Sequence, residues 1–139
     1  MDFRTYEDEL RDLLGDAPCI LSFETAAEYL GLSNGSNYHT EPVDIYVTQP
    51  LNIVGTREHL IPSFGAVEYS DVRGLRCTTI PQTIRDILRA DYDPQVIQES
   101  LSNYYFENGE SFDGLNLPPD ILPTFEHYRN WAVSYYDED

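Results

Sequence analysis

The chain has 139 residues, of which 41% are hydrophobic, and this size and composition are typical of one small folded domain. Its formal net charge is -17, from 25 acidic residues against 8 basic ones, and every basic residue is an arginine. Phosphate binding draws its affinity from lysine and arginine, so direct binding to nucleic acid is not expected. The absence of lysine also excludes P-loop and Schiff-base chemistry.

No run of apolar residues approaches the roughly 18 to 20 needed to span a bilayer. The first residues lack the basic-then-apolar order of a secretory signal, so we expect a cytoplasmic protein. Cys19 and Cys77 form no CxxC motif, and we expect two buried free thiols.

The first third of the chain predicts two helices. Thr5 is a candidate N-cap for a helix over residues 6–14, which Gly15 ends. Ser22 is a candidate cap for a second, short helix that ends at Gly31.

The middle of the chain predicts strands. Apolar and polar residues alternate over 43–47, which indicates a half-buried strand, and further pieces occur around 53–54, 66–69 and 75–80. Gly74 would take the left-handed position in a hairpin that joins the last two pieces. Together they predict a small, mostly antiparallel sheet.

In the last part of the chain, from Thr79 on, the apolar residues recur at helical spacing. Thr79 fits a capping box, Asp93 before a proline fits an N-cap, and a final helix is expected after Pro123. The predicted fold class is therefore α+β with about five helices in a single domain, 1–139. It comprises an N-terminal helix within 1–17, a central region 18–106, and a loop with a C-terminal aromatic helix in 107–139.

Three stretches share one pattern with a known family. They are Leu21 to Ala27 with Gly31 to Ser33, then Val43 to Pro50, then Thr83 to Leu88 followed by residues 93–105. In this order they resemble the C-terminal domain of AbiEi-type antitoxins of abortive-infection systems, over about residues 18–106. The residues that match the family motif are Ser22, Thr25, Gly31, Thr83 and Asp86.

The resemblance implies an antitoxin of a type IV toxin–antitoxin system. Such a protein counteracts an AbiEii-type nucleotidyltransferase toxin in a bacterium, often in phage defence. Longer family members carry an N-terminal winged helix, whereas here only residues 1–17 precede the matching region. The matching domains are also rich in lysine, which this chain lacks.

An enzymatic alternative starts from Gly35-Ser36 followed by Asp44, because minimal nucleotidyltransferases place Gly-Ser before a strand with two alternating carboxylates. Tyr46 occupies the second carboxylate position here. We therefore expect a turn and an edge-exposed strand aspartate, with no catalytic residue, metal or cofactor. A degenerate nucleotidyltransferase or another small enzyme remains the alternative.

Thr83 and Asp86 are expected to tie their helix to the sheet, in preference to contacting a toxin. Asp86 stands three residues before Arg89, a spacing that allows a pair on one helix face.

The C-terminal third holds more aromatic rings than one small core needs, and tyrosine and tryptophan dominate interface hot spots. The expected partner is a nucleotidyltransferase toxin with a basic surface. A third possibility is an acidic mimic of DNA, with carboxylates in two rows. The residues expected to bind the partner are Tyr104, Tyr105, Trp131, Tyr135, Tyr136, Asp137 and Glu138.

Overall fold

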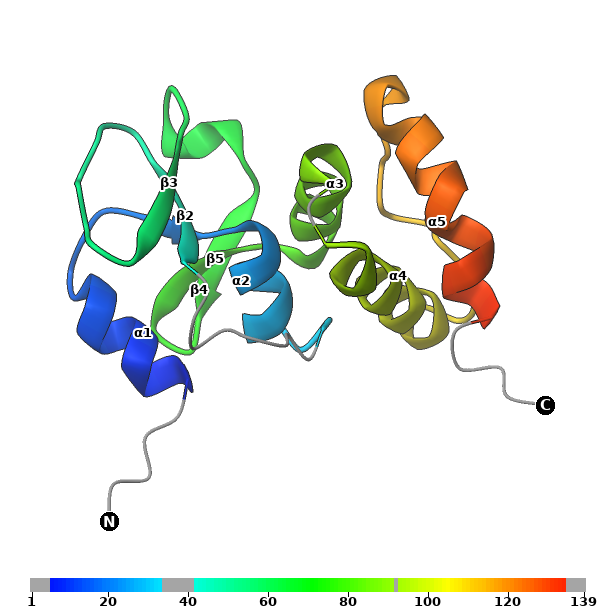
Figure 1. Ribbon diagram of the computed structural model, residues 1–139, viewed down its shortest axis with the longest axis horizontal. Helices are drawn as coiled ribbons and strands as arrows, with labels where there is room; N and C mark the ends of the chain where they lie inside the picture. The colour runs from blue at the N-terminus through cyan, green and yellow to red at the C-terminus, as the bar shows by residue number, and fades with distance from the viewer. Residues whose placement is uncertain (1–5, 34–41, 92, 135–139) are drawn as a thin grey trace, which may run out of the picture.

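The computed structural model describes residues 6–33, 42–91 and 93–134. Within these residues the helices are α1 (Tyr6–Leu14), α2 (Phe23–Tyr29), α3 (Ile80–Ala90), α4 (Pro94–Glu107) and α5 (Leu122–Ser134), with short 3-10 helices η1 (Phe64–Ala66) and η2 (Pro119–Ile121). The strands are β1 (Ile20–Leu21), β2 (Val43–Val47), β3 (Thr56–Leu60), β4 (Tyr69–Val72) and β5 (Leu75–Thr78) (Figure 1). The predicted α+β class is confirmed. None of the described helices is long and apolar enough to cross a membrane.

The strands form one sheet in the order β3-β2-β1-β5-β4. Two of the four strand pairs, β2 with β3 and β1 with β5, are parallel, and the other two are antiparallel. The sheet is therefore mixed, where the sequence pattern indicated a mostly antiparallel one. The pattern missed β3 because residues 56–60 do not alternate apolar with polar side chains. It also placed a strand near Val54, which instead lies in a turn and is 90% exposed.

The helix N-caps predicted at Thr79 and Asp93 are confirmed. The Thr79 side chain accepts a hydrogen bond from the Gln82 N–H, and the Asp93 side chain accepts one from the Gln95 N–H. Ser22 stands at the N-cap of α2, although its side chain makes no capping bond. Gly74 ends the β4–β5 hairpin turn with φ +90°, the left-handed conformation expected of it.

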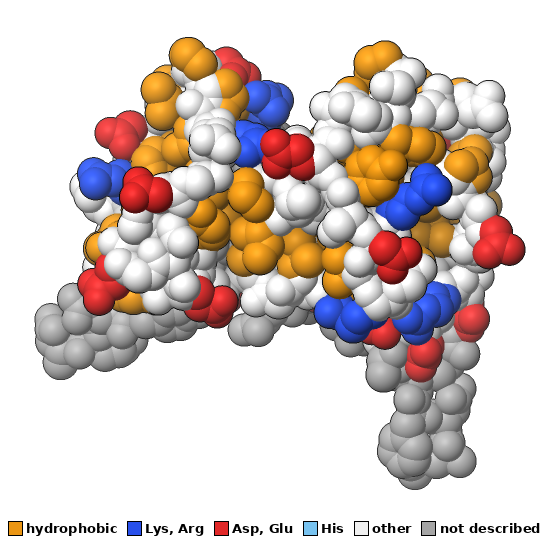
Figure 2. Space-filling view, turned by 180° about the vertical axis from the view of Figure 1, so that it is seen from behind, with side chains coloured by type: hydrophobic (Ala, Val, Ile, Leu, Met, Phe, Trp, Pro, Cys, Tyr) orange, Lys and Arg blue, Asp and Glu red, His pale blue; other side chains and the backbone are white. Residues whose placement is uncertain are grey.

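Two apolar clusters hold the elements together, and α2 belongs to both. Ala27 packs with α3, α4 and α5, whereas Ala26 and Tyr29 pack with α1 and the sheet. In Figure 1 the sheet with α1 lies at one end and α4 with α5 at the other, and Figure 2 shows a notch between the two parts. The largest fully buried side chains are Leu10, Ile20, Leu21, Ile45, Ile84, Ile87, Leu88, Ile97, Leu101, Leu115 and Ile121.

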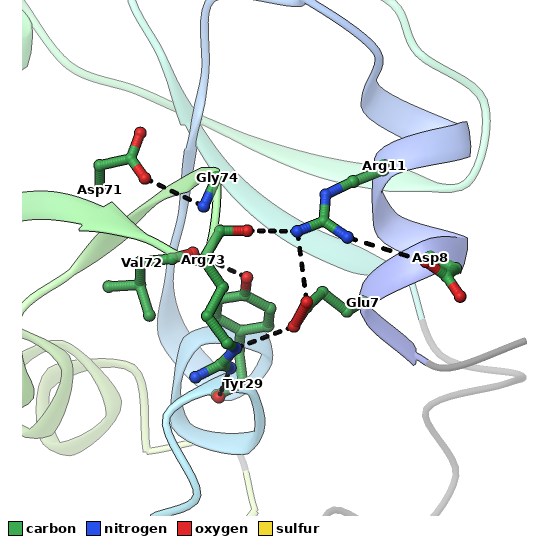
Figure 3. Close-up of polar contacts among 8 residues, drawn as sticks. All are labelled: Glu7, Asp8, Arg11, Tyr29, Asp71, Val72, Arg73 and Gly74. Atoms are coloured by element: carbon green, nitrogen blue, oxygen red, sulfur yellow. Dashed lines mark hydrogen bonds and ion pairs between the residues drawn. The ribbon is translucent and has the colours of Figure 1, made fainter.

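Polar contacts fix the hairpin to α1 and α2 (Figure 3). Arg73 Nε donates to Glu7 Oε1 at 2.8 Å, and Arg73 Nη2 donates to the Tyr29 carbonyl at 2.7 Å. The Tyr29 hydroxyl donates to the Val72 carbonyl at 2.8 Å. Arg11 of α1 donates to the Arg73 carbonyl and, at 3.2 Å, to Glu7. The hairpin is thus held at its turn as well as through the sheet.

Cys19 and Cys77 are both buried and free, as the sequence predicted. Burial raises the pKa of the Cys19 thiol to about 11 and that of Cys77 to about 12. Both therefore act as small hydrophobic side chains of the core, not as nucleophiles.

Replacing Leu101, which is 0% exposed, by alanine should lower the free energy of unfolding by about 2–5 kcal/mol, because it leaves a cavity in the helical cluster. Leu60→Ala is the matched control, since Leu60 is 63% exposed, and it should cost less than about 1 kcal/mol. Urea denaturation followed by circular dichroism measures both. Equal losses for the two variants would contradict the described packing.

Candidate functional site

Asp44 lies in the middle of β2 with its side chain only 1% exposed. Arg57 on β3, directly opposite in the strand register, donates to its carboxylate through Nε at 2.7 Å and Nη2 at 3.3 Å. Nε2 of His59, also on β3, lies 3.0 Å from the same carboxylate. The prediction of an edge-exposed aspartate was wrong, because β3 covers β2 and makes it an inner strand.

This arrangement leaves the Asp44 carboxylate with cationic and N–H neighbours where a divalent cation would need further oxygen ligands. Its backbone N–H donates to Thr25 Oγ1 at 2.8 Å, so the residue also ties α2 to the sheet. The ring of Phe23 covers His59, with centroids 4.1 Å apart. Within the described ranges no group of three or more His, Cys, Asp or Glu side chains is placed to hold a metal.

Thr83 ties α3 to the sheet, as expected. Its hydroxyl lies 2.6 Å from the Thr78 hydroxyl and donates to the Thr78 carbonyl of β5 at 3.3 Å. Asp86 is buried and accepts a hydrogen bond from Gln82 Nε2 at 3.0 Å, and burial raises the pKa of its carboxyl. Arg89 Nε lies 3.0 Å from Asp120 Oδ2 in η2. Arg89 therefore pairs with Asp120 and not with Asp86, the partner that the sequence spacing allowed.

The other family-motif residues also serve the fold. Ser22 is fully buried at the start of α2, and its N–H donates to the Asp44 carbonyl at 3.1 Å. Thr25 accepts the Asp44 N–H, and Gly31 follows the end of α2. The motif residues therefore help to join α2 and α3 to the sheet.

Three of the aromatic residues predicted to bind a partner, Tyr104, Tyr105 and Trp131, lie in the described part of the chain. Trp131 on α5 is 54% exposed, and among the described residues the ring that lies nearest to it is that of His127, with centroids 5.5 Å apart. Tyr104 and Tyr105 are half-buried near the end of α4, and in the described part of the chain no ring contact joins them to Trp131. The remaining predicted residues, Tyr135, Tyr136, Asp137 and Glu138, lie outside the described residues.

An aromatic side chain and three carboxylates gather where α4 ends. Phe106 is 41% exposed, and Glu107, Glu110 and Asp113 are exposed around the turn that follows. The Phe106 ring packs against Tyr105 with centroids 5.0 Å apart. We call Tyr105, Phe106, Glu107, Glu110 and Asp113 the acidic-aromatic surface. The carboxylates were missed in the sequence because they fall in a loop, although three acids within seven residues after an aromatic run were a readable signal.

Hydrogen bonds fix the loop that carries this surface. Asn108 Nδ2 donates to the carbonyls of Ser111 at 3.1 Å and Asp113 at 2.9 Å, and the Tyr104 hydroxyl also donates to the Asp113 carbonyl. Gly114 has φ +94°, and a Cβ there would lie only 2.8 Å from the Tyr104 hydroxyl oxygen. The loop is therefore ordered before any partner arrives, which lowers the entropic cost of binding.

Most of the arginines that the structure describes pair with a carboxylate of the same chain. Arg85 lies 3.3 Å from Glu68, and Arg89 lies 3.0 Å from Asp120. Arg11, Arg57 and Arg73 also pair with carboxylates. Figure 2 shows blue and red side chains side by side on the face it presents. With 25 acidic residues in the chain against 8 arginines, pairing with arginine leaves a large excess of negative charge.

No family model, curated protein or solved structure matches the chain. Function is therefore inferred from the residues of the chain itself and from their order along it.

Asp44→Asn should lower the free energy of unfolding by about 1–3 kcal/mol, because the substitution removes the charged acceptor from Arg57 and His59. Asp16→Asn is the control, since Asp16 is exposed, and it should change stability by less than about 0.5 kcal/mol. Urea titrations at neutral pH compare the two.

Adding Mg²⁺ to the wild-type protein should leave its melting temperature unchanged. A metal site built on Asp44 would instead raise that temperature in proportion to occupancy. A Mg²⁺-dependent rise that disappears in the Asp44→Asn variant would contradict the structural role of the carboxylate.

Proposed function

We propose that this chain is an antitoxin-like protein-binding module that counteracts an AbiEii-type nucleotidyltransferase toxin in the bacterial cytoplasm. The elements that carry the resemblance, α2, β2, the β4–β5 hairpin, α3 and α4, occur in the order that the family pattern implies. The observation that carries the proposal is the acidic-aromatic surface, an exposed ring among exposed carboxylates on an ordered loop.

The chemistry of this surface suits a basic protein partner. An enzyme that binds nucleotides or RNA needs a positively charged groove, and the carboxylates of Glu107, Glu110 and Asp113 complement such a groove. Phe106 adds apolar area that a partner can bury, and an aromatic face also attracts lysine or arginine side chains. Charge would thus set the association rate, and the ring would contribute to the lifetime of the complex.

Trp131 offers a second contact from α5. Its side chain is more than half exposed, which is unusual for a residue of this size in a monomeric surface. The His127 ring lies beside it on the same helix, one turn earlier, with the two ring planes tilted by 60°.

The test is binding between this chain and an AbiEii-type nucleotidyltransferase toxin. The double variant Glu107→Gln, Glu110→Gln should slow association about tenfold at low salt, because steering by charge is lost. Phe106→Ala should weaken affinity by about 1–2 kcal/mol, chiefly through faster dissociation. Surface plasmon resonance at two salt concentrations measures both rates.

The matched control is Asp16→Asn, Glu126→Gln, which removes the same charge from exposed positions elsewhere. It should leave the association rate close to that of the wild type. Equal slowing by both double variants would mean that only net charge matters, and absence of a complex at either salt concentration would contradict the proposal.

A further inference from the structure

A cavity of about 270 Å³ lies between the α1–β1 connection and the β4–β5 hairpin. Its floor consists of the buried apolar residues Leu14, Cys19, Leu21 and Leu75. Pockets for drug-sized ligands occupy roughly 300–1,000 Å³, so this cavity suits a smaller molecule. Apolar side chains thus line part of the cavity, and its volume accommodates one small molecule.

Two opposite charges line the cavity without neutralising each other. Asp71 and Arg76 face each other across β4 and β5, a position at which opposite charges usually pair. Asp71 Oδ1 instead accepts the Gly74 N–H at 3.0 Å. The Arg76 guanidinium lies over two rings, 5.5 Å from the Phe64 centroid and 6.0 Å from that of Tyr69. Among the described residues Arg76 has no ion pair with a carboxylate.

A further carboxylate, that of Asp16, lies in the same lining and is exposed. The charged residues of the lining are thus one guanidinium and two carboxylates. This set complements a molecule that carries both a carboxylate and an ammonium group. The apolar floor complements an aliphatic group on the same molecule.

We propose that this cavity binds a free α-amino acid with an aliphatic side chain of about the size of leucine. The side chain occupies the floor, the α-carboxylate pairs with Arg76, and the α-ammonium group pairs with Asp16 and Asp71.

The walls of the cavity are held in place before any ligand binds. Arg11 of α1 donates to the Arg73 carbonyl in the hairpin turn, and Arg73 donates back to Glu7 of α1 (Figure 3). These contacts tie the helix that leads into one wall to the hairpin that forms the other. Because Arg11 and Arg73 are engaged with carboxylates, they compete less with Arg76 for the ligand. A preformed cavity lowers the entropic cost of binding.

Other ligand classes leave part of this arrangement unexplained. A nucleotide exceeds the cavity, and its phosphates would meet two carboxylates. A lysine side chain from a partner protein would use Asp16 and Asp71 but would be repelled by Arg76. The amino-terminal residue of a peptide lacks the free carboxylate that Arg76 would bind.

The inference does not rest on the proposed function, because the cavity lies by α1 and the hairpin, at the other end of the molecule from α4 (Figure 1). Amino-acid binding and partner binding can therefore fail separately.

Titration of the ¹⁵N-labelled full chain with L-leucine tests the proposal by NMR. Saturable shifts are expected at the amides of Gly15, Asp16, Gly74 and Arg76. Leucinamide lacks the carboxylate and N-acetyl-leucine lacks the ammonium group, so each should bind at least about tenfold more weakly. No shifts with millimolar leucine, or equal binding of all three compounds, would overturn the proposal.

Two variants test which side chains bind the charged groups of leucine. Arg76→Met keeps the aliphatic stem and Asp71→Asn keeps an acceptor for the Gly74 N–H, and each should weaken leucine binding about tenfold. Arg129→Met and Glu126→Gln make the same charge changes outside the lining and should bind leucine like the wild type. Unchanged affinity in both cavity variants, with spectra that show a folded chain, would overturn the assignment.

Discussion

The buried carboxylate of Asp44, held between Arg57 and His59, is the interaction on which the rest of the structure depends. It joins β2 to β3 through side chains as well as through the backbone ladder, and its own N–H reaches Thr25 on α2. A buried carboxylate without such partners would cost several kcal/mol. The same pairing places a guanidinium and an imidazole against the Asp44 carboxylate, where the sequence pattern predicted an exposed side chain.

The sequence predicted the local structure well where one residue decides it. Thr79 and Asp93 cap helices, and Gly74 turns a hairpin, because each choice depends on neighbours within a few residues. The sheet order depended on contacts distant in sequence, so the parallel strand β3, with residues of both charges and little alternation, was not predicted. The environment of Asp44 was missed for the same reason.

The candidate site was likewise predicted only in part from the sequence. The sequence placed Trp131 on a helix after Pro123, which is α5, but it could not show whether the Trp131 ring meets that of Tyr105; no such contact occurs among the described residues. The ordered loop after α4 depends on Asn108 and Tyr104, which bond the same carbonyl from different directions. Most of the described arginines pair with carboxylates of the same chain, and the proposal of a basic partner rests on the exposed ring and the carboxylates at the end of α4.

Hydrogen exchange of this chain, alone and mixed with an AbiEii-type nucleotidyltransferase, tests the proposed binding surface most directly. Amides at the end of α4 and in the loop over residues 104–114 should exchange more slowly in the mixture, whereas those of α1 should be unchanged. Protection confined to other elements would contradict the assignment of the surface. Identical exchange with and without the nucleotidyltransferase would contradict the proposal that the chain acts by binding it.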